Sequence, residues 1–168
     1  MTAAPRNPPR WRDSLFGAHK IRAACRFVVA PDIALRAIAD VADALRAEGF
    51  ALAEAPEGVV VLRRGSVIGD TILNGTGLTL ITKRIGPLSV KAIVVVHAAP
   101  SGEDAEVTAS MLAGDELAPV ITDAVDAVID RLIARGIPVD GPGWTRSVDL
   151  PRQNIGHPKT AREHGLPR

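Results

Sequence analysis

The chain has 168 residues, a formal net charge of +1, 46% hydrophobic and 23% charged side chains. These values are typical of one soluble globular domain and leave little room for two. Only 3% of the residues are aromatic and none is Tyr, which argues against proteins that bind RNA or single strands by stacking bases on exposed rings.

Charge is unevenly distributed along the chain. Residues 1–23 carry five basic side chains and one acidic one, residues 24–135 carry ten and fifteen, and residues 136–168 carry five and three. An acidic body between basic ends suggests arms that bind an anionic partner. Short basic tails that only keep the chain soluble are the alternative.

A single cysteine, Cys25, excludes an internal disulfide and is typical of a reducing compartment. Its position in the first predicted strand favours a small core residue over a nucleophile. The longest apolar run, Ala92 to Val96, is too short for a membrane span, and no secretory signal is recognisable. We therefore predict a cytoplasmic protein without a membrane span.

Residues 1–20 lack helical or strand periodicity and are predicted to form a flexible basic arm, which includes Trp11 and Arg12. A strand is predicted over 21–30, and Pro31 and Asp32 then open a helix that ends at Gly49. The spacing of its apolar residues predicts one buried stripe made of Ala34, Ile38, Val41 and Leu45.

The next segments predict an antiparallel sheet. Strands over 50–55 and 59–64 form a hairpin. A weaker strand follows over 66–73 and, after an Asn-Gly turn, the next strand over 78–85. The central strand, residues 88–98, alternates between an apolar and a mixed set. The first set should face a core, and the second should face water or a partner: Leu88, Val90, Ala92, Val94 and Val96, against Ser89, Lys91, Ile93, Val95 and His97.

A half-buried strand over 105–113 follows, with Val107, Ala109 and Met111 on its apolar side and Glu106, Thr108 and Ser110 on the other. A second amphipathic helix is predicted over 115–135, with its apolar face made of Leu117, Ile121, Ala124, Val125, Val128 and Leu132. We predict a single domain over 21–136. Residues 137–168 are expected to form a tail that contains Pro and Arg.

This order predicts an α+β fold in which an antiparallel sheet of about six or seven strands curves around the last helix. The order β-α-β6-α, and locally Val28-Val29-Ala30-Pro31 leading into a helix with Ala39-Asp40, resembles the helix-grip fold of the START and polyketide-cyclase (SRPBCC) superfamily. The single helix between the first two strands departs from the family's pattern. A smaller antiparallel α+β sandwich is the competing architecture.

The resemblance implies a ligand site between the sheet and the last helix. A small apolar ligand would then contact side chains from the central strand, the next strand and that helix, namely Val94, Val96, Met111, Ile121 and Val125.

Two groups of surface residues are candidates for binding. Arg64, Lys83 and Lys91 lie on strands expected to be neighbours, where they could receive a carboxylate or phosphate, or form an ordinary solvated face. Trp11 with Arg12, and Trp144 with Arg146, combine two residue types that dominate interface hot spots. Either each pair docks a protein partner, or its Trp folds back onto the sheet.

The histidines give no strong signal. His97 ends the central strand near Glu103 and Asp104, but no second ligand lies at a metal-like spacing, so a surface histidine is the favoured interpretation. His157 and His164 fall in the predicted tail, which offers no rigid scaffold.

Three functional classes follow from these observations. The first is a non-catalytic protein that binds a small apolar ligand, and the second is an assembly protein that docks partners through its arms. The third is a cyclase-like enzyme, which ranks last because no acid–base pair converges on the expected cavity. The sequence predicts no catalytic residue, metal site or cofactor, does not favour nucleic-acid binding, and leaves the oligomeric state open.

Overall fold

The computed structural model describes residues 22–65 and 92–166. The predicted arm 1–20, with Trp11 and Arg12, lies outside these ranges, as do the predicted strands over 66–73 and 78–85 with Lys83, and the start of the central strand with Lys91.

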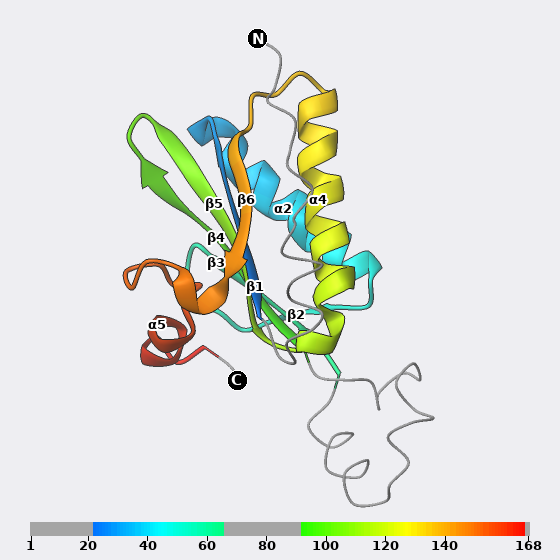
Figure 1. Ribbon diagram of the computed structural model, residues 1–168, viewed down its shortest axis with the longest axis vertical. Coiled ribbons are helices and arrows are strands. Elements are labelled where there is room, and N and C mark those ends of the chain that lie inside the picture. Colours follow the sequence, from blue (N-terminus) through cyan, green and yellow to red (C-terminus); the bar gives the residue numbers. More distant parts are fainter. Residues whose placement is uncertain (1–21, 66–91, 167–168) are drawn as a thin grey trace, which may run out of the picture.

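The described residues form an α+β fold, as predicted, with a six-stranded antiparallel sheet in the order β2-β3-β4-β5-β1-β6. Helices α2 and α4 pack on one face of this sheet (Figure 1). The elements are β1 (Ala23–Val29), α2 (Pro31–Ala47), β2 (Ala51–Ala53), β3 (Val59–Arg64), β4 (Ala92–Ser101), β5 (Asp104–Ala113), α4 (Ala118–Ala134), β6 (Asp140–Arg146) and α5 (Pro158–Glu163).

The main core lies between the sheet and the two helices. Strands β1, β3, β4 and β5 contribute alternate side chains to it, such as Phe27 from β1 and Val94 from β4, both fully buried. The predicted stripe of α2 is buried there as well. The last long helix therefore packs on the sheet as expected, and α2 shares the same face with it (Figure 1).

Helix α4 begins later than the spacing of its apolar residues predicts. Asp115–Leu117 form a short 3-10 turn, and the α-helix starts at Ala118. Pro119 has no backbone N–H, so it cannot donate to the carbonyl of Asp115 and the first α-helical hydrogen bonds form after it. The predicted buried face is otherwise found, with Leu117 half-buried at its start.

The largest difference from the sequence-based expectation concerns residues 137–166, which form a folded part of the molecule instead of a tail. Strand β6 pairs antiparallel with β1, with Trp144 opposite Cys25. Its Gly-Pro-Gly sequence has low strand propensity, so the sequence does not predict a strand here. Pro142 is tolerated because β6 lies at the sheet edge.

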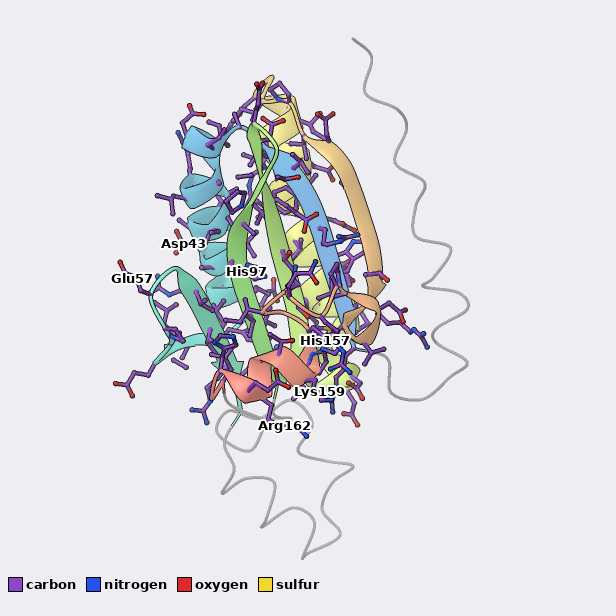
Figure 2. All side chains as sticks on the ribbon, turned by 90° about the vertical axis from the view of Figure 1, so that its left-hand side faces the viewer. Asp43, Glu57, His97, His157, Lys159 and Arg162 are labelled. Atoms are coloured by element: carbon purple, nitrogen blue, oxygen red, sulfur yellow. The ribbon has the colours of Figure 1, made fainter. Side chains whose placement is uncertain are left out.

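The remaining residues, 147–166, are called the C-terminal segment below. This segment crosses the sheet face opposite α2 and α4 and ends in α5 (Figure 2). Ala161 and Leu166 there cover Ile93 and Val95 of β4, together with Val61 and Leu112, in a second small core. The mixed side of the central strand thus meets a partner that belongs to the same chain.

Neither α2, α4 nor any other helix within the described ranges combines the length and hydrophobicity needed to cross a bilayer.

Candidate functional site

The C-terminal segment covers only part of its sheet face. Next to it, no described element lies over β1, β4 and β5, where alternate residues point away from the main core (Figure 2). We call this area the open patch and define it by the half-buried residues Arg26, Val28, Ala99 and Glu106. Register places these residues side by side, since Glu106 lies opposite both Val28 and Ala99.

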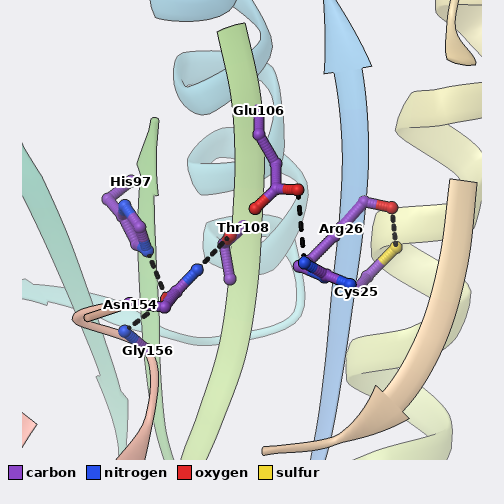
Figure 3. Close-up of polar contacts among 7 residues, drawn as sticks. All are labelled: Cys25, Arg26, His97, Glu106, Thr108, Asn154 and Gly156. Atoms are coloured by element: carbon purple, nitrogen blue, oxygen red, sulfur yellow. Dashed lines mark hydrogen bonds and ion pairs between the residues drawn. The ribbon is translucent and has the colours of Figure 1, made fainter. Parts of the chain in front are cut away.

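A buried polar network connects the open patch to the C-terminal segment, and Asn154 is its centre (Figure 3). The Asn154 side-chain amide donates through Nδ2 to Thr108 Oγ1 at 3.0 Å. Its Oδ1 accepts the backbone N–H of Gly156 at 2.8 Å and lies 2.8 Å from His97 Nε2. A buried side chain with every polar atom engaged in this way holds the segment in one position.

The same contacts determine which ring nitrogen of His97 carries a proton. A backbone N–H can only donate, so the atom of Asn154 that faces Gly156 must be the amide oxygen. An amide oxygen can only accept, and it also faces His97 Nε2. His97 must therefore carry a proton on Nε2.

His97 is 5% exposed, and this burial sets its charge state. Desolvation lowers the pKa of His97 below its ordinary value of 6.5, although the Asn154 hydrogen bond, the Ala98 backbone and the Glu106 carboxylate act in the opposite direction. The ring is neutral at pH 7.

Glu106 and Arg26 form a loose ion pair on the open patch. Arg26 Nη1 lies 3.4 Å from Glu106 Oε2, and the two side chains are 41% and 25% exposed. A single contact of this length between half-exposed groups contributes little to stability. Figure 3 shows one carboxylate oxygen turned to Arg26 and the other turned away from it, on the side of Thr108.

A pocket of about 280 Å³ opens beside Glu106. Its apolar wall consists of Ala99, Pro100, Pro151 and Ile155, and its polar wall of His97, Glu106, Gln153 and Asn154. A second hollow of about 190 Å³ lies on the other side of Glu106, between Arg26 and Trp144. Glu106 therefore stands between two hollows on the same sheet face.

This arrangement is suited to binding. The Nε2–H of His97 is already donated to Asn154, and the ring is held by that bond. Within the described ranges, no group of three His, Cys, Asp or Glu side chains is placed to hold a metal ion.

The five predicted cavity residues lie together in the main core. Val94, Val96, Met111 and Val125 are fully buried and Ile121 is 1% exposed. The pockets beside Glu106 lie on the opposite face of the sheet and involve none of these residues.

The predicted basic patch can be followed only through Arg64. Arg64 lies opposite Ala92, on the sheet side that carries α2 and α4, and its guanidinium Nε lies 3.7 Å from where a Cβ on Gly49 would be. Lys83 and Lys91 lie outside the described ranges, so the patch itself stays a prediction.

Trp144 and Arg146 are both engaged within the chain. The Trp144 indole packs against the main core and donates through Nε1 to Asp126 of α4 at 2.8 Å. Arg146 holds Asp149 through two contacts of 2.6 and 2.8 Å, and this pairing lowers the pKa of Asp149. For Trp144, the alternative in which the aromatic side chain folds back onto the domain describes what is found.

Two histidine interpretations are corrected. His97 is not a surface residue, because the C-terminal segment buries it. His157 is also buried, and its Nδ1 accepts the backbone N–H of Lys159 at the start of α5, so its surroundings are ordered. Both errors have the same origin, namely the interpretation of the C-terminal segment as a tail.

Sequence reasoning missed Asn154 and Gln153 as site residues, and it gave Glu106 no role. One local signal was present, since Asn154 followed two residues later by Gly156 is typical of an Asx turn. Alternation along the strands also placed Glu106, Thr108 and His97 on outward-facing sides.

Neither the comparison with protein-family models nor the search of curated proteins finds a match for this chain.

Proposed function

We propose that the protein binds a small molecule without transforming it, and that the binding site is the pocket beside Glu106. The observation that carries the proposal is a pocket with one apolar wall and one polar wall, where the polar groups come from paired strands and an ordered amide network. Ligand pockets combine an apolar lining with a few fixed polar groups in this way, and begin at roughly 300 Å³. Rigid strands also hold such groups more accurately than loops do.

The proposed site differs in position from the apolar cavity implied by the helix-grip resemblance. In that region the side chains from the sheet and α4 are buried against one another in one cluster. A ligand there would have to displace core side chains. The pocket beside Glu106 needs no such rearrangement, because it opens to the surface.

The relationship to the START and polyketide-cyclase superfamily remains part of the proposal. It is supported by an antiparallel sheet with a long helix, α4, packed on one face. Residues 66–91 would have to contribute further strands for the full helix-grip order. A cytoplasmic location is also proposed, and the buried Cys25, which forms no disulfide, is compatible with it.

The proposal can be tested by a fragment screen monitored by two-dimensional NMR of isotope-labelled protein. We expect several small fragments to shift the side-chain amide signals of Gln153 and Asn154 and the imidazole signals of His97, with saturable dependence on concentration. A bulky substitution in the apolar wall, Ala99→Leu, should abolish these shifts while the signals of α2 stay unchanged.

Binding of fragments only at other residues, or no saturable shift at all, would contradict the proposal. Native mass spectrometry of the purified protein gives a second readout, since a ligand retained from the host should be lost in Ala99→Leu.

A further inference from the structure

We infer that the ligand of this pocket is a small primary amine in its ammonium form, bound by the carboxylate of Glu106. The inference rests on the proposed function and adds the chemical class of the ligand.

Among the described residues, the contact found for the Glu106 carboxylate is the one with Arg26. Its Oε2 makes the 3.4 Å contact with Arg26, whose side chain is 41% exposed. The other oxygen is turned away from Arg26, to the side on which Thr108 is drawn (Figure 3). An ionised carboxylate can only accept hydrogen bonds. A ligand that displaces solvent from the pocket must therefore donate a hydrogen bond to this oxygen.

No other described residue of the pocket lining supplies a positively charged donor for this oxygen. Among the described residues that line it, Glu106 is the one formally charged side chain at pH 7, since Gln153 and Asn154 are neutral amides and His97 is neutral. The Nε2–H of His97 is donated to Asn154. The described lining therefore carries one charge, which is negative and is partly offset by Arg26, 3.4 Å away and outside the lining. This charge favours a cation over an anion in the pocket.

The shape and lining narrow the class of cation further. Ala99, Pro100, Pro151 and Ile155 offer a short aliphatic surface suited to an alkyl chain. No Phe, Tyr or Trp side chain is among the described residues that line this pocket, whereas quaternary ammonium groups are usually bound by cages of these side chains. A primary ammonium group, in contrast, can donate directly to Glu106 in a charge-assisted hydrogen bond.

The test compares ligands of one shape and different charge. n-Butylammonium, 1-butanol, butyrate and butyltrimethylammonium are titrated at pH 7 and low salt into the wild-type protein, with the NMR signals of His97, Gln153 and Asn154 as the readout. We expect n-butylammonium to bind about tenfold more tightly than each of the others, the difference between a charged and a neutral hydrogen bond.

Three variants connect the effect to Glu106. Glu106→Gln keeps the shape and removes the charge, and should reduce n-butylammonium binding to the level of 1-butanol. Glu57→Gln is the matched control, since Glu57 lies in the exposed turn before β3 and is not among the described residues that line the pocket, and should leave the affinity unchanged. Arg26→Gln removes the competing cation and should strengthen n-butylammonium binding severalfold.

The outcomes separate this inference from the proposed function. Equal affinities for the four compounds, or tightest binding of butyrate, would overturn the cation inference and leave the binding site in place. The inference also fails if Glu106→Gln binds n-butylammonium as well as wild type does. If fragments of no charge class shift the pocket signals, the proposed function fails together with it.

Discussion

Replacement of Gly156 by Ala is the sharpest test of how the C-terminal segment is held. A Cβ at this position would lie 2.8 Å from Ser110 Cβ and 3.0 Å from Asn154 Oδ1, with Leu150 Cδ1 at 3.3 Å. The contact with Ser110 involves a strand residue in the middle of the sheet, which cannot move away. The segment must therefore shift.

The expected loss of stability follows from these contacts. Excess volume in a packed site costs about 1–3 kcal/mol. A shift would also lengthen the 2.7 Å bond from Ser110 Oγ to the Gly156 carbonyl and the bond from Gly156 N–H to Asn154, and each such bond contributes about 1 kcal/mol. We expect a total loss of about 2–4 kcal/mol, a large part of the total stability of a typical domain.

The measurement is urea denaturation followed by circular dichroism, combined with hydrogen exchange. Exchange should increase in 147–166 and in the covered strands β4 and β5, more than in α2. Gly143→Ala is the matched control, because a Cβ there meets only the Gly141 carbonyl oxygen, at an ordinary 3.7 Å. A loss below about 0.5 kcal/mol in Gly156→Ala, with unchanged exchange, would show that the segment does not pack closely on Ser110.

Three further predictions concern the same face and its edge. Asn154→Ala should cost about 2–4 kcal/mol in urea denaturation, because it leaves the Gly156 N–H and the His97 Nε2–H without their acceptor; no loss would mean that water replaces the amide. Burial lowers the pKa of His97, so the unfolded chain binds more protons than the folded one below pH 6.5. The stability of the wild type should therefore fall from pH 7 toward pH 5 more steeply than that of His97→Gln. Parallel pH profiles of stability would contradict this. Trp144→Phe keeps the ring in the core but removes the 2.8 Å bond to Asp126, which should cost about 1 kcal/mol by the same denaturation assay, and an unchanged midpoint would show that the bond contributes nothing.

The parts of the fold that could be predicted are those with local periodicity. The apolar stripe from Ala34 to Leu45 and the alternation in β4 and β5 each reflect the side of the element that faces the main core, and this side is visible in the spacing of apolar residues. The spacing of apolar residues predicts too early a start for α4, because this spacing contains no information about the missing N–H of Pro119.

The C-terminal segment could not be predicted in this way. Its attachment depends on single polar contacts between residues far apart in sequence, such as Asn154 with Thr108 and Ser147 with the carbonyl of Met111. No periodic pattern accompanies such contacts. The apolar residues Ile93 and Val95 on the mixed side of β4 did indicate a contact surface, but they carried no information about what covers it.

The candidate site depends partly on local periodicity and partly on contacts between residues far apart in sequence. Alternation alone places Glu106 and His97 on outward-facing sides of neighbouring strands. The part of the pocket lining between Pro151 and Ile155 belongs to the C-terminal segment, which the sequence predicts to be a tail. The pocket could therefore not be recognised before that segment was placed.

The position of β1 in the sheet has a consequence for biosynthesis. β1 is the first described strand, yet its two neighbours, β5 and β6, comprise residues 104–113 and 140–146. During translation, β1 has no partner strand until β5 has emerged from the ribosome, and its second side stays bare until β6 follows. Ile93 and Val95 likewise stay exposed until Ala161 and Leu166 have been made. Until these partners have been made, the nascent chain presents an unpaired strand and apolar surface, the kind of surface that general chaperones bind.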